Sequence, residues 1–267
     1  MNEIIKTFSE LHPAFGQAAI CRLGQHSFLL KVGETMIAVD PFLSEFPGRL
    51  VPPLIPAAEL EGVDLILGSH DHEDHIDRPA LPLMASASPE AKFIVPEALL
   101  ASMDCFPRER ILGSDDLKRH EVAGVTITGI AAAHEFFDRD AGGHYPYLGY
   151  VIHGNGVTIY HSGDCCIYEG LLGKLAAFDC DLLLLPINGR DARRYSGGFI
   201  GNMTYQEAAD LAGWLETPLT IPGHYDMFAG NTEDPLLFTE YMRVKYPALK
   251  TEMLSPGEVR LLTLRKL

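Results

Sequence analysis

The residues with the clearest chemical potential form one segment, Ser69-His70-Asp71-His72-Glu73-Asp74-His75-Ile76-Asp77. It holds three imidazoles and four carboxylates within nine residues, and it follows the apolar run 63–67. Imidazole and carboxylate groups are ligands that suit zinc, manganese or iron. A short apolar run of this kind predicts a buried strand, so the ligands should leave the strand's end on a loop that a substrate can reach. We therefore expect a metal-dependent enzyme.

Further ligands should come from other strand ends, because one loop rarely completes a coordination shell. Three ionisable residues, His134, Asp164 and His224, each follow a predicted strand. A merely solvated acidic loop at 69–77 would explain neither its three histidines nor these three later residues. The pattern therefore favours a site assembled from several strand ends.

The elements that must position these residues fall into two strand-rich halves. Strands at 18–23, 26–32 and 36–40, joined by tight turns, predict an antiparallel meander. The Pro-rich stretch 41–56 follows, and its length suits a lid or substrate loop. Further strands are expected at 63–68, 93–95, 111–112, 125–130, 148–152, 157–160, 181–185, 219–221 and 259–262.

Helices are expected between these strands, near 79–87, from Pro96, at 168–178, from the capping box Thr204-Tyr205-Gln206-Glu207 to Leu215, and at 234–246. Two strand sets, each with its own helices, indicate an α/β protein built as a four-layer αβ/βα sandwich. The sequence contains no short-period repeat and no linker that would divide it. We therefore predict a single domain, residues 1–267.

Composition limits the classes of partner. A net charge of −15 over 267 residues makes nucleic acid an unlikely partner, because nucleic-acid binding depends on basic surface. An anionic small substrate stays compatible, since a bound dication reverses the local field. The chain has no apolar run of about 18 residues and no signal-peptide start, which predicts no membrane partner. Five cysteines without a disulfide framework fit a reducing compartment, so we expect a cytoplasmic protein.

The pattern His70-x-His72-x-Asp74-His75, followed by His134, Asp164 and His224, resembles that of the metallo-β-lactamase superfamily over nearly the whole chain. Within the superfamily it is most similar to the L-ascorbate-6-phosphate lactonase group. That similarity also rests on Gly24-Gln25-His26-Ser27-Phe28-Leu29, Asp40-Pro41-Phe42, Phe137-Asp138-Arg139, Tyr160-His161-Ser162-Gly163-Asp164, Asn202-Met203-Thr204 and Pro222-Gly223-His224-Tyr225-Asp226. The chain looks shorter than the lactonase at both ends, and its loop 189–201 looks different.

The resemblance implies two adjacent divalent metal ions, with zinc and manganese both suited to the ligands. The implied ligands are His70, His72 and His134 for one ion, and Asp74, His75 and His224 for the other, with Asp164 bridging. A metal-bound hydroxide would then attack a small ester or lactone, with phosphorylated sugar lactones such as L-ascorbate 6-phosphate as the leading class. Two alternatives stay open. One is a phosphodiesterase acting on cyclic nucleotides, phospholipid-like diesters or RNA, and the other is a metal- or ligand-binding protein without turnover.

The candidate catalytic residues are Asp74, which is also an implied ligand, Tyr225 and His144. Asp74 could position or deprotonate the attacking water, and Tyr225 could donate a hydrogen bond to a developing oxyanion or simply pack. His144 is a candidate proton donor to the leaving group.

Substrate binding and ligand orientation have their own candidates. The basic cluster Arg190, Arg193 and Arg194 could grip an anionic substrate or form a solvated loop. His26 and Asp40 could orient a metal ligand or serve as ordinary turn residues. Apolar residues of the Pro-rich loop suit a lid or a subunit contact equally, so a homo-oligomer is possible.

Overall fold

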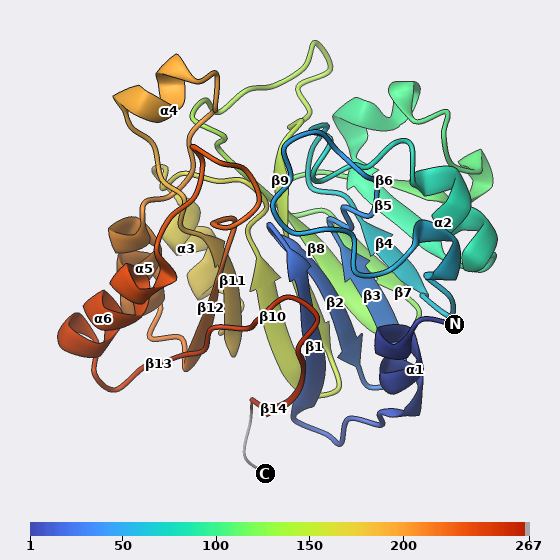
Figure 1. Cartoon of the computed structure of the whole chain (residues 1–267), viewed down its shortest axis with the longest axis horizontal. Helices are drawn as coiled ribbons and strands as arrows, with labels where there is room; N and C mark the ends of the chain where they lie inside the picture. Colours follow the sequence, from blue (N-terminus) through green and yellow to red (C-terminus); the bar gives the residue numbers. More distant parts are fainter. Residues whose placement is uncertain (265–267) are drawn as a thin grey trace.

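The computed structural model describes residues 1–264, so the last three residues of the predicted 1–267 domain lie outside the described residues. Within residues 1–264 the strands form two seven-stranded sheets that pack face to face, with helices on their outer faces (Figure 1). The strands of the first sheet are β1 (Gln17–Gly24), β2 (Ser27–Val32), β3 (Thr35–Val39), β4 (Leu65–Leu67), β5 (Lys92–Pro96), β6 (Ile111–Ser114) and β14 (Val259–Thr263).

The strands of the second sheet are β7 (Arg119–Val122), β8 (Val125–Ala131), β9 (Leu148–Gly154), β10 (Val157–His161), β11 (Leu182–Pro186), β12 (Leu219–Gly223) and β13 (Lys250–Thr251). The α-helices are α1 (Glu3–Glu10), α2 (Leu81–Ala87), α3 (Leu171–Ala176), α4 (Ala192–Ser196), α5 (Tyr205–Trp214) and α6 (Pro235–Lys245). Short 3-10 helices lie at Ala57–Glu59, Glu97–Ser102 and Arg108–Arg110. None of the described helices is both long and apolar enough to cross a bilayer.

Both sheets begin with antiparallel pairing and continue with parallel pairing. In the first sheet β1, β2 and β3 form the predicted antiparallel meander, and β3 to β6 then pair in parallel. In the second sheet β7 to β10 are antiparallel neighbours, and β10 to β13 pair in parallel. The strands β8, β10 and β12 therefore run in one direction, and their carboxyl ends lie at one edge of the sheet.

The end of β4 meets this same edge from the first sheet. The Leu148 amide donates to the Ser69 carbonyl at 3.0 Å, and the Tyr150 hydroxyl donates to the Gly68 carbonyl at 2.8 Å. Gly68 has no space for a side chain, because a Cβ atom there would lie 2.8 Å from Ile76. These contacts place the histidine-rich loop beside the strand ends of the second sheet.

Apolar side chains fill three layers, as a four-layer sandwich requires. Along β1, Ala18 and Ile20 face the core between the sheets, while Ala19, Cys21 and Leu23 face the core beneath helices α1 and α2. This is the two-residue alternation of a strand that is buried on both faces. A third core lies between the second sheet and helices α3, α5 and α6. The predicted αβ/βα sandwich is confirmed.

Several elements differ from the sequence-based expectation. The expected helix 168–178 is shortened to α3, because Gly170 adopts a left-handed backbone with φ of +97°. The helix expected from Pro96 is a 3-10 helix, Glu97–Ser102. The elements α1, β7, α4 and β13 were not expected. Each is at most eight residues long and buries few side chains, so a short stretch of sequence carries little evidence for it.

Candidate metal centre

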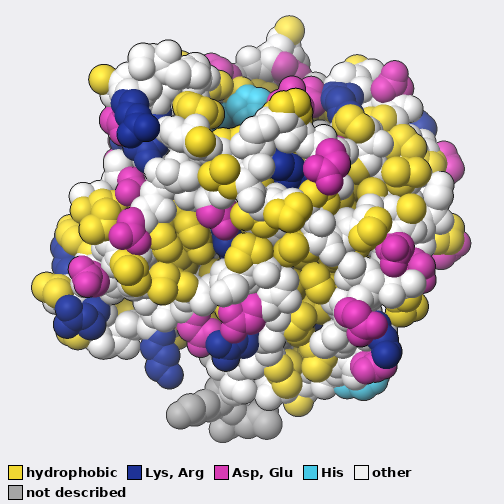
Figure 2. Space-filling model, in the orientation of Figure 1, with side chains coloured by type: hydrophobic (Ala, Val, Ile, Leu, Met, Phe, Trp, Pro, Cys, Tyr) yellow, Lys and Arg dark blue, Asp and Glu magenta, His cyan; other side chains and the backbone are white. Residues whose placement is uncertain are grey.

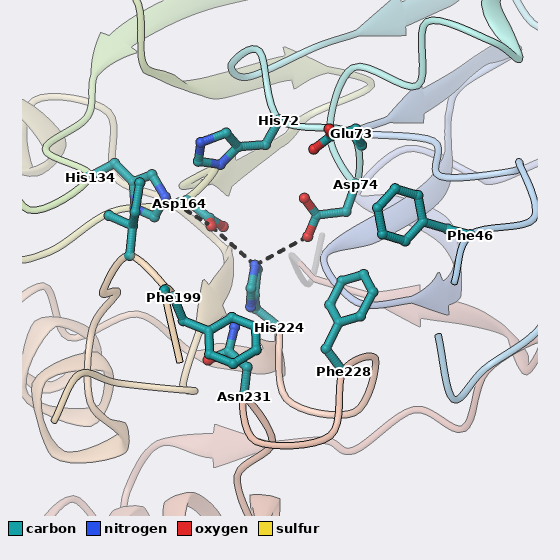
Figure 3. Close-up of a pocket in the computed structure, with 12 residues that line it drawn as sticks. Phe46, His72, Glu73, Asp74, His134, Asp164, Phe199, His224, Phe228 and Asn231 are labelled. Atoms are coloured by element: carbon teal, nitrogen blue, oxygen red, sulfur yellow. Dashed lines mark ion pairs between the residues drawn. The ribbon is translucent and has the colours of Figure 1, made fainter. Parts of the chain in front are cut away.

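The predicted ligands converge at the common edge of the two sheets (Figure 3). His70, His72, Asp74 and His75 lie on the loop after β4, and the second sheet supplies the other three from the ends of β8, β10 and β12. Their ligand atoms form two groups in which all atoms lie within 4.8 Å of one another: His70, His72, His134 and Asp164, and Asp74, His75 and His224. The sequence therefore identified residues that meet in space, and their role as metal ligands stays a prediction.

Asp164 lies between the two groups. Its Oδ1 is 3.2 Å from His75 Nε2, and its Oδ2 is 3.0 Å from His224 Nε2 and 3.6 Å from His134 Nε2. Its approach depends on Gly163, which has a φ of +56° and whose Cβ would lie 2.6 Å from the Leu148 carbonyl oxygen. Asp164 therefore lies beside histidines of both groups, and its bridging of two ions stays a prediction.

The chemistry of the donor set fits divalent cations. His75 Nε2 and Asp164 Oδ1 are buried and have no hydrogen-bond partner among the described residues. Buried polar atoms normally have partners, because leaving one unsatisfied costs free energy. A cation between these atoms would satisfy both, and imidazole with carboxylate suits zinc or manganese.

Contacts behind the ligands fix which nitrogen faces the cluster. Asp40 Oδ2 lies 2.7 Å from His75 Nδ1, so His75 presents Nε2 to the cluster. His134 Nδ1 lies 3.1 Å from the Gly201 carbonyl oxygen and is oriented in the same way. A carboxylate or carbonyl behind a histidine ligand is a common feature of metal sites. From the sequence, Asp40 is either a residue that orients a ligand or an ordinary turn residue. The structure shows a contact with His75 that suits the orienting role.

The histidines of the site differ in the direction of their pKa shifts. Burial lowers the pKa of His70 well below its ordinary value and also lowers the pKa of His134, which keeps both imidazoles neutral. Although burial opposes it, the carboxylates Asp164, Asp74 and Asp40 raise the pKa of His75. Burial also opposes ionisation of Asp164, yet the imidazoles of His224 and His75 hold its pKa well below the ordinary range. The carboxylates of the centre thus favour positive charge beside them, on an imidazole or on a bound cation.

Gln25 is a member of the site that the sequence did not single out. It is 2% exposed, its Nε2 donates to Asp74 Oδ2 at 2.6 Å, and its carbonyl accepts from the His224 amide at 2.8 Å. It thereby ties Asp74 to the loop after β12. Gln25 lies in the stretch Gly24-Gln25-His26-Ser27. Its amide side chain is not ionisable, whereas the imidazole of the neighbouring His26 is, so the sequence indicated His26 instead. His26 is buried, its carbonyl accepts from His161 Nε2 at 2.8 Å, and its ring contacts no ligand through an observed hydrogen bond.

The other two candidate catalytic residues lie outside the pocket lining. His144 Nδ1 pairs with Asp115 Oδ2 at 2.6 Å. Tyr225 packs beneath the buried Arg22 guanidinium, 4.3 Å from the ring centroid, in the third core. Neither residue lines the pocket, so a role in proton transfer or oxyanion binding stays a prediction for both.

The arginine cluster is also absent from the pocket lining. Arg190 forms a bidentate pair with Glu207, with both distances 2.7 Å. Arg194 pairs with Asp191 and also donates to the Thr232 carbonyl. Arg193 lies on the exposed surface of α4. Two of the three guanidinium groups are thus engaged within the protein, so an anion grip by this cluster gains no support from the structure.

An open pocket of about 280 Å³ leads to the ligands. In Figure 2 histidine is visible at the upper edge of the molecule, among hydrophobic and acidic side chains. The pocket is lined by Phe46, His72, Glu73, Asp74, His134, Asp164, Gly198, Phe199, Ile200, His224, Phe228 and Asn231. Asp74 is the one candidate catalytic residue that lines it. A small molecule can therefore reach the cluster directly.

Comparison with known proteins agrees with this architecture. Residues 35–225 match the family model described as "Beta-lactamase superfamily domain". A UPF0173 metal-dependent hydrolase of Thermococcus onnurineus is 32% identical over 243 residues, covering 89% of this chain and 96% of the relative. The corresponding protein of Thermococcus kodakarensis is 30% identical, covering 88% and 96%. A metallo hydrolase structure from Ignicoccus hospitalis superposes with a TM-score of 0.71 at 24% identity, covering 92% and 98%. The chain therefore belongs to the metallo-β-lactamase superfamily, together with these metal-dependent hydrolases.

Proposed function

We propose that this protein is a metal-dependent hydrolase that cleaves the acyl C–O bond of a small ester or lactone. The observation that carries the proposal is the convergence of seven histidine and aspartate side chains beside an open pocket. They form two groups, and Asp164 of the first group lies 3.2 and 3.0 Å from His75 and His224 of the second. Family membership supports hydrolysis, and the relatives' descriptions specify metal dependence without a substrate.

The ligand groups suggest a place for two divalent ions. His70, His72 and His134 would hold one ion, Asp74, His75 and His224 the other, and Asp164 would contact both. Divalent ions bound there would lower the pKa of a water molecule and polarise a carbonyl oxygen. Zinc and manganese both suit these ligands.

The chain's own residues would prepare the reaction. Asp74 lines the pocket, and its Oδ2 already accepts the hydrogen bond from Gln25. Its Oδ1 is therefore the oxygen left to orient the attacking water or accept its proton. Asp40 behind His75 would keep the imidazole in one orientation throughout the reaction.

Away from the scissile bond, the pocket lining favours an uncharged group over an anionic one. None of the described residues that line the pocket is lysine or arginine, and Glu73 adds a negative charge. A phosphate away from the scissile bond, as on a phosphorylated sugar, would find no cationic side chain in this lining. The scissile phosphoryl group of a diester would instead meet the bound dications, so the substrate panel below is what separates diesters from esters. Scattered lysine and arginine on the face in Figure 2 also give no continuous track for RNA.

The test combines metal content with activity in one sample. Protein purified without chelator is analysed for bound metals and assayed on matched lactones, esters and phosphodiesters. We expect about two equivalents of zinc or manganese and lactone or ester cleavage. Phosphodiester cleavage alone would overturn the substrate assignment, and metal-loaded protein inert on every class would favour a binding protein.

Two ligand variants and a surface histidine complete the test. The variants His72→Ala and Asp164→Ala should lose both metal and activity. His153→Ala is the matched control, because His153 lies on β9 and pairs with Thr158 rather than with the cluster. Full metal content and activity in both ligand variants would refute the site.

A further inference from the structure

The wall of the pocket beside the ligand cluster is aromatic. Phe46 and Phe228 lie side by side, and Phe199 and Asn231 also line the pocket (Figure 3). The ring centroids of Phe46 and Phe228 are 5.9 Å apart with an interplanar angle of 75°. Both rings also contact the buried Phe42, at 5.8 and 6.4 Å. Two of these three contacts are edge-to-face and the third is tilted. Such contacts stabilise the arrangement of the rings, so an apolar surface exists before any ligand binds.

Two loops hold this wall. The Leu50 amide of the Pro-rich loop donates to the Met227 carbonyl at 2.7 Å. Arg49 stacks over Phe42 at 4.3 Å and donates to the Val51 carbonyl at 2.7 Å. Its remaining guanidinium nitrogens donate to the carbonyls of Ser44 and Phe42. The arginine nearest the wall in sequence is therefore engaged with backbone oxygens and is not free to bind a substrate anion.

The polar groups of the pocket are suited to an uncharged ligand. Asn202 Nδ2 donates to Asn188 Oδ1 at 3.1 Å, and Asn188 Nδ2 donates to Asn231 Oδ1 at 3.0 Å. This series of hydrogen bonds occupies the side-chain oxygen of Asn231 and leaves its amide NH₂ group as a neutral donor at the pocket. Glu73 is the only ionised side chain that lines the described pocket apart from the ligand residues, and it repels anions.

We propose that the substrate is an uncharged ester or lactone with an aryl or alkyl group beside its carbonyl, and that this group packs against Phe46, Phe199 and Phe228. The inference rests on the proposed function and names its substrate class. Burial of one methylene against such a wall strengthens binding about fourfold. A phosphate on the same substrate would face Glu73 and gain no cationic partner from the described lining.

The direct test measures binding without turnover. Five- and six-membered lactams are ring amides that mimic lactones and, without the ring strain of a four-membered lactam, resist hydrolysis. A series bearing methyl to hexyl groups, a phenyl lactam, and the same rings bearing a phosphate are titrated calorimetrically into the metal-loaded protein. We expect affinity to rise about three- to fourfold per methylene until the wall is covered. The phosphorylated rings should bind at least about tenfold more weakly than the phenyl lactam.

Variants distinguish loss of the aromatic wall from loss of the folded structure. Phe199→Ala and Phe228→Ala should flatten the dependence on chain length while metal content stays unchanged. Phe15→Ala is the matched control, since Phe15 is 61% exposed beside the turn at Gly156, outside the pocket. Phe199→Arg should reverse the preference and favour the phosphorylated rings, because it adds the cation that the pocket lacks.

The outcomes distinguish this inference from the proposed function. Tighter binding of phosphorylated rings to the unaltered protein, or affinity independent of chain length, would overturn the apolar substrate class even if lactones are hydrolysed. The expected lactam series in a protein that cleaves no ester or lactone would support the apolar site and refute the proposed reaction.

Discussion

At the scale of single residues, the site depends on contacts behind the ligands as much as on the ligands. Asp40 accepts hydrogen bonds from the Ser69 amide and hydroxyl at 2.8 and 2.7 Å while facing His75 Nδ1. Its backbone is left-handed, with φ of +46°, a conformation that Asp and Asn tolerate better than most residues. Asp40 and Gln25 thus position the candidate ligands without belonging to either ligand group themselves.

We predict that Asp40→Asn lowers metal affinity by about 10- to 100-fold, the range typical of groups that orient ligands. Asparagine keeps the backbone conformation, but it has one acceptor oxygen for three donors. The measurement is competition for zinc against a chelator of known affinity. Asp64→Asn is the control, because the Asp64 carboxylate accepts from the Met36 amide at 2.8 Å, at the opposite end of β4 from the cluster. Equal affinities in both variants would contradict the prediction.

The pair of His144 and Asp115 gives a residue-scale pH dependence. The hydrogen bond to Asp115 raises the pKa of His144 above its ordinary value. A raised folded-state pKa means that the pair's stabilisation is fully present below the unfolded pKa of about 6.5 and is lost as the pH rises through the folded value. NMR titration of the His144 ring should show the raised pKa, and Asp115→Asn should return it toward the ordinary value. A pKa at or below 6.5 in the unaltered protein would contradict the pair.

At the scale of elements, the candidate ligands follow the carboxyl ends of strands, and a local N-terminal cap stabilises the nearby helix α5. The Thr204 hydroxyl accepts from the Glu207 amide at 3.2 Å, and the Glu207 carboxylate accepts from the Thr204 amide at 2.9 Å. This is the capping box expected from the sequence. Glu207 also binds Arg190, so α5 and the loop before it are joined.

We predict that Thr204→Ala lowers the free energy of unfolding by about 1 kcal/mol, the usual cost of losing an N-cap. Urea denaturation provides the measurement. Thr239→Ala in the middle of α6 is the control and should change stability little, because its hydroxyl donates only to the Leu236 carbonyl within the helix. Metal content should be unchanged in both variants, and a smaller loss in Thr204→Ala than in Thr239→Ala would be inconsistent with the cap.

At the scale of the whole molecule, the candidate centre joins the two sheets. The loop after β4 supplies four of its residues, and the ends of β8, β10 and β12 supply the other three. The buried Arg22 at β1 adds a second connection, because its Nη2 lies 2.5 Å from Asp226 Oδ1 after β12. Bound cations would thus stabilise the packing of one sheet against the other.

Metal removal should therefore destabilise the entire fold. A ligand that binds only the folded state contributes about 2.7 kcal/mol at one hundred times its Kd. After chelation and dialysis we expect a lower Tm, restored by added zinc or manganese. Asp164→Ala protein is the control and should show no such restoration. A Tm that is independent of metal in the unaltered protein would argue against a centre that spans both sheets.

The sequence by itself determined the fold class and the seven converging residues, because both depend on local patterns. Apolar runs specify buried strands, and His70 to His75, His134, Asp164 and His224 follow such runs directly. It also indicated the capping box at Thr204, whose partners are only three residues apart.

Only the tertiary structure decided which polar residues join the site and which do not. Gln25, Asn231 and the phenylalanine wall come from separate loops, and no spacing along the chain relates them. The arginines of the loop 189–201 found acceptors within the protein, and His144 found Asp115, so their charge pattern did not indicate pocket residues. Side chains on loops acquire their partners through long-range packing, and packing is the property that a linear pattern of residues does not contain.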